Sequence, residues 1–126
     1  MLEKRILGKT GLEVSRLALG GLFISDCAAS RQESCNVIKR AWELGINYID
    51  TAPSYHDSED VLGEALHKID ADFIVSTKIG NLPASSLHPQ DKSFLKEQLE
   101  RSFQRLNRQH VNILMIHEPD RPTEFY

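Results

Sequence analysis

Short apolar runs recur along this chain, separated by longer segments in which apolar and polar residues are mixed. The four short runs are residues 16–21, 46–50, 73–78 and 111–116. Each is apolar almost throughout, rather than alternating with polar residues. This pattern is typical of strands in a parallel sheet that is covered on both faces. We therefore predict four β-strands in these segments.

In the segments between these runs, apolar residues repeat at intervals of three and four, which predicts three amphipathic helices. Ser30 and Glu33 have capping-box spacing at the start of the first helix, and Gly45 is a helix stop. Ser58 is expected to cap the second helix. The expected apolar faces consist of Val37, Ile38, Ala41 and Trp42, then Val61, Leu62, Ala65 and Leu66, then Leu95, Leu99, Phe103 and Leu106.

Strands and helices thus alternate, which predicts an α/β fold with a parallel sheet and right-handed crossovers. The segment RILGKTGLEVS precedes the first of these strands. It places Gly8 and Gly11 around a polar turn, which predicts a small β-hairpin. With 126 residues, the chain is long enough to form one domain with a hydrophobic core, and we expect residues 1–126 to form a single domain.

Composition narrows the class of protein. The chain is 40% hydrophobic and 26% charged, and its net charge of −3 comes from interspersed acids and bases. No apolar run approaches the roughly 18 residues of a membrane span, and the charged N-terminus lacks a signal-peptide core. Cys27 and Cys35 fit neither a disulfide framework nor a zinc site. We expect a soluble cytoplasmic protein with reduced thiols that binds neither nucleic acid nor membrane.

Residues with chemically useful side chains follow the predicted strands. Asp50, Lys78 and His117 stand at the ends of three successive strands, and Tyr55 comes five residues after Asp50. The carboxyl ends of parallel strands lie along one edge, with neighbouring strands about 4.8 Å apart. Active sites of α/β proteins form at this edge. The four side chains are therefore expected to converge.

Other interpretations of these residues remain open. Each side chain, taken singly, could have a purely structural role. A metal-dependent hydrolase would use His56, His117, Asp50 and Glu118, whereas a Schiff-base aldolase would use Lys78 as its nucleophile. The basic residues of the third helix are interpreted as a solvated face and are assigned no role.

The combination of the four residues favours proton donation to a carbonyl oxygen. A free tyrosine has a pKa near ~10, which is too high for efficient proton transfer at neutral pH. An ammonium such as that of Lys78 would lower the pKa of Tyr55, and Asp50 would keep the lysine charged and oriented. His117 could hydrogen-bond the carbonyl oxygen. The site has no electron source of its own, so the hydride must come from a cofactor.

Four stretches together resemble the aldo/keto reductase family: LGKTGLEVSRLALGG, GINYIDTAPSYHDSEDVLGEAL, STKIG and RSFQRLNRQHVNILMIHEPD. The resemblance covers essentially the whole chain. It implies the N-terminal portion of a (β/α)8 TIM barrel, NADP(H) or else NAD(H) as cofactor, and aldehyde, ketone or sugar substrates. It also implies that Tyr55 is the general acid, that Lys78 and Asp50 tune it, and that His117 orients the carbonyl.

The resemblance further implies which residues would line the binding pocket. Gly21, Leu22 and Asp50 would contact the nicotinamide. Phe23 would form part of the substrate wall, together with Tyr55 and His117. No metal ligand is implied.

The chain departs from the family in its length. A barrel of this type needs about 250 residues, whereas this chain ends just after its fourth strand. The resemblance implies that most cofactor contacts come from the missing second half. The alternative is therefore a truncated, catalytically silent half-barrel that needs a partner or the missing half. Its open strand edges would favour self-association.

Overall fold

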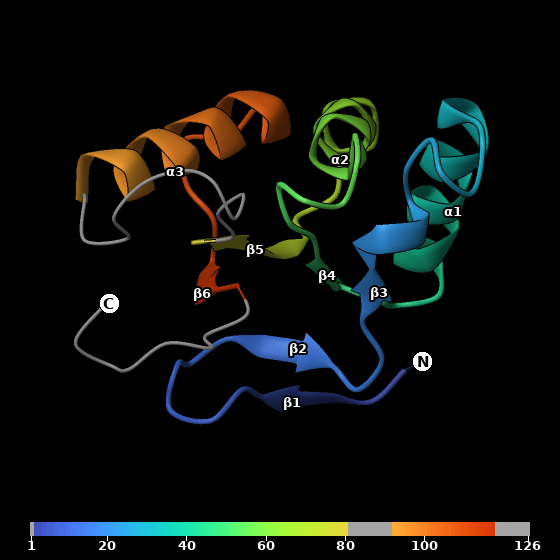
Figure 1. The fold of residues 1–126 in the computed structure, drawn as a ribbon. Helices are drawn as coiled ribbons and strands as arrows, with labels where there is room; N and C mark the ends of the chain where they lie inside the picture. Colours follow the sequence, from blue (N-terminus) through green and yellow to red (C-terminus); the bar gives the residue numbers. More distant parts are fainter. Residues whose placement is uncertain (1, 81–91, 118–126) are drawn as a thin grey trace.

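The computed structural model describes residues 2–80 and 92–117, which form two sheets, a short 3₁₀ helix and three α-helices (Figure 1). The antiparallel hairpin consists of β1 (Lys4–Ile6) and β2 (Glu13–Ser15). The parallel sheet has the order β3 (Leu19–Gly20), β4 (Tyr48–Asp50), β5 (Ile74–Ile79) and β6 (Ile113–Ile116). The helices are η1 (Gly21–Phe23), α1 (Arg31–Glu43), α2 (Ser58–Lys68) and α3 (Lys92–Leu106). The predicted α/β fold and the preceding hairpin are confirmed.

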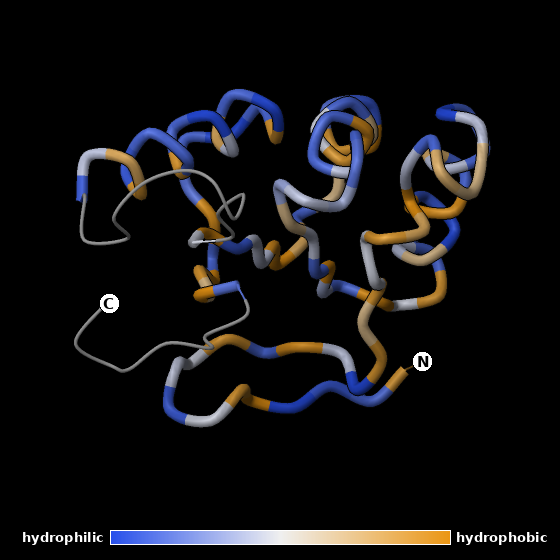
Figure 2. The backbone as a smooth tube through the Cα atoms, viewed as in Figure 1, coloured by the Kyte–Doolittle hydropathy of each residue, from blue (hydrophilic) through white to orange (hydrophobic). Residues whose placement is uncertain are grey.

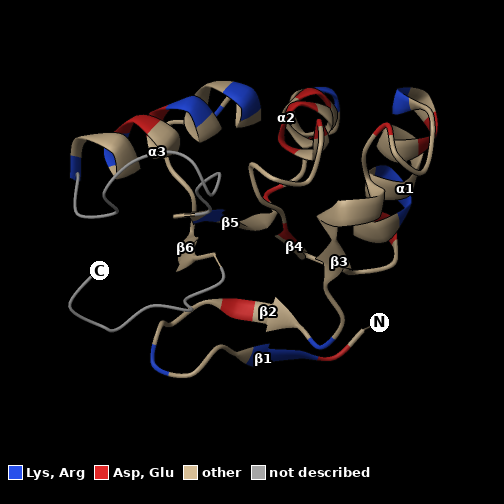
Figure 3. Ribbon diagram, viewed as in Figure 1, with Lys and Arg blue, Asp and Glu red and all other residues tan. Residues whose placement is uncertain are grey.

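The helices α1, α2 and α3 lie along one side of the parallel strands, and the hairpin lies on the other side (Figure 1). The sides of the helices that face away from the strands are largely hydrophilic (Figure 2), and the helices carry charges of both signs (Figure 3). No helix within residues 2–80 and 92–117 is long and apolar enough to cross a membrane. The core between helices and strands contains Ile24, Ile38, Ile49, Val61, Leu62, Ala65, Phe73, Val75 and Leu106.

All four strands of the parallel sheet begin one to three residues later than predicted, and an asparagine side chain makes hydrogen bonds just before two of them. Asn47 accepts from the backbone N–H of Ser15 at 2.7 Å and donates to the carbonyl of Glu13 at 2.9 Å, which joins the sheet to the hairpin. Asn112 accepts from the backbone N–H of Val75 at 2.9 Å. These side-chain hydrogen bonds accompany backbone pairing just before β4 and β6, where the Asn47 carbonyl accepts from the Ile74 N–H at 2.8 Å and the Asn112 N–H donates to the Val75 carbonyl at 3.0 Å.

The capping box predicted for α1 is confirmed. The Ser30 hydroxyl accepts from the Glu33 backbone N–H at 3.3 Å, and the Glu33 carboxylate accepts from the Ser30 backbone N–H at 2.9 Å. The expected burial of Val37 is wrong, because its side chain is 47% exposed. The buried face is centred on Ile38, and consecutive residues in a helix are about 100° apart. Val37 therefore lies at the margin of this face.

The predicted cap of α2 is also wrong. Asp57 is the N-cap residue and makes no side-chain cap hydrogen bond. Ser58 is buried inside the helix, where its hydroxyl donates to the carbonyl of Gly21 at 2.8 Å and lies 2.9 Å from the Thr51 hydroxyl. Ser58 has the local spacing of a cap, but its hydrogen bonds join α2 to η1 and to Thr51, the residue after β4.

Candidate active site

The centre of the site is an ion pair between β4 and β5. The two strands are parallel, with Asp50 paired to Ser76, and Lys78 projects from the same side of β5 as Ser76. Lys78 Nζ lies 2.7 Å from Asp50 Oδ2 and 3.0 Å from the carbonyl oxygen of Thr51. The lysine side chain is only 12% exposed. Its charge is therefore held by two oxygens at the carboxyl end of β4.

Tyr55 reaches this ion pair through the loop between β4 and α2. The loop is folded by two backbone hydrogen bonds, from Tyr55 N–H to the Ala52 carbonyl at 3.0 Å and from Ser58 N–H to the Tyr55 carbonyl at 2.9 Å. They return the chain toward the sheet. Lys78 Nζ then lies 4.6 Å from the centroid of the Tyr55 ring. This cation–π contact places the phenol ring against the lysine charge.

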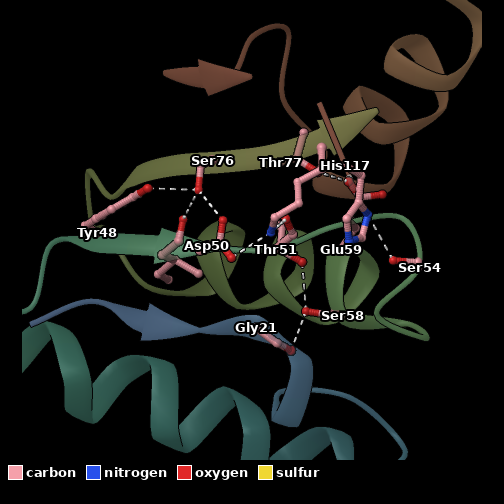
Figure 4. A network of polar contacts seen from close by, with 12 residues as sticks. Gly21, Tyr48, Asp50, Thr51, Ser54, Ser58, Glu59, Ser76, Thr77 and His117 are labelled. Atoms are coloured by element: carbon pink, nitrogen blue, oxygen red, sulfur yellow. Dashed lines mark hydrogen bonds and ion pairs between the residues drawn. The ribbon is translucent and has the colours of Figure 1, made fainter. Parts of the chain in front are cut away.

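His117 completes the group from β6. Its backbone N–H donates to the carbonyl of Ile79 at 2.7 Å, which continues the pairing of β6 with β5. Its ring meets the Tyr55 ring edge-on, with centroids 5.8 Å apart and an interplanar angle of 90°. Nδ1 lies 3.3 Å from the Ser54 hydroxyl, on the loop that carries Tyr55 (Figure 4). The structure thus brings Asp50, Tyr55, Lys78 and His117 to one edge of the sheet.

The other predicted site residues follow β3 at the same edge. A Cβ on Gly21 would lie 2.7 Å from the carbonyl oxygen of Asp50, so only glycine allows η1 to approach β4 this closely. Leu22 and Phe23 are 40% and 72% exposed. Their apolar side chains are available beside the charged group rather than packed in the core.

A buried carboxylate behind the site was missed by the sequence interpretation. The Glu59 side chain is 1% exposed and accepts hydrogen bonds from Thr77 Oγ1 and Arg105 Nε, both at 2.6 Å. The interpretation of the third helix's basic residues as a solvated face is therefore wrong for Arg105. It is also wrong for Arg108, which donates to the carbonyl of Phe73 at 3.1 Å. An acid on the apolar face of α2 was the available signal, because a buried carboxylate needs a partner.

A second chain of polar contacts inside the sheet was also missed. Ser76 is fully buried and its hydroxyl donates to Asp50 Oδ1 at 2.7 Å, while the Tyr48 hydroxyl donates to Ser76 Oγ at 3.2 Å (Figure 4). The strand pattern contained the signal, because Tyr48 and Asp50 alternate on β4 as Ser76 and Lys78 do on β5.

A hydrogen bond and an ion pair on the surface join the loop after η1 and the start of α1 to the loop that carries Tyr55. Asp57 accepts from the Asp26 backbone N–H at 2.8 Å and from Arg31 at 2.7 Å. Arg31 also contacts Glu64, and this hydrogen bond is the main cause that raises the pKa of Arg31. The pKa of Glu64 is lowered, chiefly by its hydrogen bond from Lys68 and then by Arg31.

The geometry bears on the two other enzyme classes. Within residues 2–80 and 92–117, no three His, Cys, Asp or Glu side chains are grouped to hold a metal ion. His56 Nδ1 faces Asp26 Oδ1 at 3.6 Å instead, and Glu118 lies outside the described residues. Lys78 Nζ is held by Asp50 Oδ2 at 2.7 Å and by the Thr51 carbonyl oxygen at 3.0 Å, so this amine is not free to attack a carbonyl carbon. This arrangement favours a charge-stabilising role for the lysine over Schiff-base formation.

Comparison with known proteins identifies the family. Residues 16–126 match the model of the aldo/keto reductase family. The chain is 30% identical to L-galactose dehydrogenase of Arabidopsis thaliana, covering 93% of this chain and 38% of the relative. It is 27% identical to an A. thaliana protein named "Probable voltage-gated potassium channel subunit beta", with 97% and 39% covered.

Solved structures agree with this match. The aldo-keto reductase AKR11C1 from Bacillus halodurans, in its holo form, superimposes with a TM-score of 0.81 at 28% identity, covering 98% of this chain and 43% of that one. The described fold is the N-terminal portion of such a reductase barrel. The chain spans less than half the length of these relatives. It belongs to the aldo/keto reductase family.

Proposed function

We propose that the protein is an NAD(P)H-dependent oxidoreductase that interconverts carbonyls and alcohols, with aldehydes, ketones or sugars as substrates. NADP(H) is the preferred cofactor in this proposal and NAD(H) the second choice. The observation that carries it is the position of Tyr55, whose ring lies 4.6 Å from Lys78 Nζ and 5.8 Å from the His117 ring. A phenol, an ammonium and an imidazole at one sheet edge can together serve a carbonyl oxygen.

Each of the four residues has one role. Tyr55 donates its hydroxyl proton to the substrate oxygen as that oxygen becomes an alcohol. The Lys78 ammonium stabilises the negative charge left on the phenol oxygen, and Asp50 holds the ammonium in place at 2.7 Å. His117 orients the carbonyl by a hydrogen bond to its oxygen. The nicotinamide cofactor, when bound, supplies the hydride to the carbonyl carbon.

The neighbouring residues of β3 and η1 support a cofactor and substrate pocket. Gly21, Leu22 and Asp50 would hold the nicotinamide, and Phe23 would form a substrate wall with Tyr55 and His117. The exposed apolar surfaces of Leu22 and Phe23 fit a flat aromatic ring and a small organic substrate. We place this reaction in the cytoplasm.

The strands at both edges of the parallel sheet support a second proposal, which concerns how residues 1–126 would hold the cofactor. β3 and β6 each have one neighbour among the described strands, and Leu114 of β6 is 43% exposed. We propose that residues 1–126 form one domain that carries the acid–base group but needs further strands to hold the dinucleotide. A second copy, another chain or the remainder of a barrel could cover these edges.

Spectrophotometric assay of the intact protein, meaning these residues together with whatever strands complete the sheet, tests the proposed function. The protein is incubated with NADPH or NADH and a panel of aldehydes, ketones and sugars, and nucleotide oxidation is followed. We expect turnover of at least one carbonyl, with a higher kcat/KM for NADPH. A protein that binds NADPH but turns over no member of the panel would contradict the proposal.

A further inference from the structure

We propose that Ser76, held in turn by Tyr48, is a positioning residue for the Asp50–Lys78 pair. The inference rests on the proposed function for its catalytic consequence, but its structural content stands on the contacts alone. It assigns a positioning role to two polar side chains of the sheet for which the sequence analysis proposed no role.

The positions of these residues follow from the register of the sheet. Asp50 pairs with Ser76 across β4 and β5. Because side chains alternate along a strand, Tyr48 and Asp50 share one face of β4, and Ser76 and Lys78 share the same face of β5. The four polar side chains therefore form a continuous row on the sheet.

The hydrogen bonds along this row end on the carboxylate of Asp50. Ser76 Oγ donates to Oδ1 at 2.7 Å, and Lys78 Nζ donates to Oδ2 at 2.7 Å. A hydroxyl has one proton to give, so Ser76 can accept from the Tyr48 hydroxyl at 3.2 Å while it donates to Asp50. Both carboxylate oxygens are thereby engaged by the sheet.

This arrangement fixes a torsion that is otherwise loose. The last side-chain torsion of aspartate is broad, so a carboxylate held at one oxygen can still rotate. With Oδ1 held by Ser76, the other oxygen is directed at Lys78. Tyr48 in turn limits the hydroxyl rotor of Ser76, whose other neighbour is the Ile49 carbonyl at 3.5 Å. Lys78 is thus held where its charge meets the Tyr55 ring.

Ser34 provides a contrast within the same protein. Like Ser76 it is a buried serine, but its hydroxyl has no hydrogen-bond partner among the described residues. Burial of a serine therefore does not by itself require the contacts that Ser76 makes. Ser34→Ala is a matched control, because it removes a buried hydroxyl without removing a hydrogen bond.

Chemical labelling of lysines tests the proposal without relying on turnover. The chain is treated with an amine-acetylating reagent, and the rate of modification at Lys78 is measured by mass spectrometry, with exposed Lys68 as the internal reference. We expect Ser76→Ala to raise the Lys78 rate several-fold. Tyr48→Phe should raise it less, and Ser34→Ala should leave it unchanged. An unchanged Lys78 modification rate in folded Ser76→Ala overturns the proposal. If Ser76→Ala does not fold, an unchanged Lys78 modification rate in Tyr48→Phe overturns it instead.

Kinetics of the intact protein provide the second measurement. We expect Ser76→Ala to lower kcat about tenfold, as for the loss of one hydrogen bond to a charged group, with little change in KM. Ser76→Thr restores the hydroxyl and should recover most of kcat. Faster Lys78 labelling in a protein without reductase activity would retain the positioning role and reject the proposed function. A Ser76→Ala protein with a normal Lys78 labelling rate and a normal kcat would reject the positioning role and retain the proposed function.

Discussion

Lys78 Nζ and Asp50 Oδ2 lie 2.7 Å apart although 28 positions separate the two residues in sequence. The contact depends on the parallel pairing of β4 and β5, which sets Asp50 beside Ser76 and brings Lys78 to the same edge. The ion pair therefore links the fold to the proposed chemistry, because the sheet register determines where the lysine charge meets Tyr55.

Loss of the lysine charge should disable the proposed reaction. We expect Lys78→Met to lower kcat of the intact protein by about a hundredfold or more, since charge stabilisation of this kind contributes at least that much. Steady-state kinetics with NADPH and an aldehyde measure it. Lys68→Met is the control, because Lys68 is an exposed residue that pairs with Glu64 on α2. Equal losses in the two variants would contradict the assignment.

The buried Glu59–Arg105 pair should matter for stability. We expect Arg105→Met to reduce the free energy of unfolding by about 3 kcal/mol, because it leaves a buried carboxylate without its cation. Arg101→Met is the control, since Arg101 pairs with Glu97 on the exposed face of α3, and exposed pairs contribute little. Urea unfolding compares the variants. Similar urea midpoints for Arg105→Met and Arg101→Met would contradict this prediction, because they would mean that Arg105 does not stabilise the buried Glu59 carboxylate.

Gly63 should be required for the packing of α2 against α3. A Cβ at this position would overlap the carbonyl oxygen of Arg105 and lie 2.8 Å from the carbonyl carbon of Leu106. Alanine in a helix gains about 1 kcal/mol over glycine, but overpacking costs about 1–3 kcal/mol. We expect net destabilisation of Gly63→Ala in thermal unfolding. Gly20→Ala, where a Cβ meets nothing within 4 Å, should change stability little. A Gly63→Ala protein with a higher unfolding temperature than wild type would contradict this prediction, because it would mean that α2 and α3 move apart at little cost.

The capping box of α1 should give stability a defined pH dependence. The pKa of Glu33 is lowered from its ordinary 4.5, first by the Ser30 hydroxyl and then by the Ser30 backbone N–H. A carboxyl with a lowered folded-state pKa adds stability above the unfolded-state value, and this is lost as pH falls through the folded-state value. Wild type should therefore exceed Glu33→Gln in stability at neutral pH and approach it in acid. A difference that stays constant across an acid series of urea unfolding curves would contradict this.

The sequence predicted correctly the features that depend on residues close together along the chain. The Ser30–Glu33 capping box lies within four residues, and β4 ends at Asp50 as its short apolar run predicts, whereas β5 continues one residue past Lys78 to Ile79. Ser58 has the same local signal as a cap, but a tertiary contact with Gly21 determines its role. Its actual hydrogen bonds could not be deduced from spacing alone.

Non-local pairs account for most of what the sequence did not reveal. Glu59 and Arg105 are 46 positions apart, and nothing in either segment identifies the other as its partner. The bond between Ser76 and Asp50 likewise depends on which residues face each other across two strands. Periodicity predicts the face on which a residue lies, but the sheet register decides its partner.

The central claim is that Tyr55 supplies the proton to the substrate oxygen. The most direct test is a comparison of Tyr55→Phe with the unmodified intact protein, measuring kcat for aldehyde reduction by NADPH together with nucleotide binding by fluorescence titration. Phenylalanine keeps the ring that Lys78 and His117 contact and removes only the hydroxyl. We predict loss of nearly all kcat with nucleotide affinity largely unchanged. A Tyr55→Phe protein that keeps most of its kcat would contradict the account, because the proton would then come from another group.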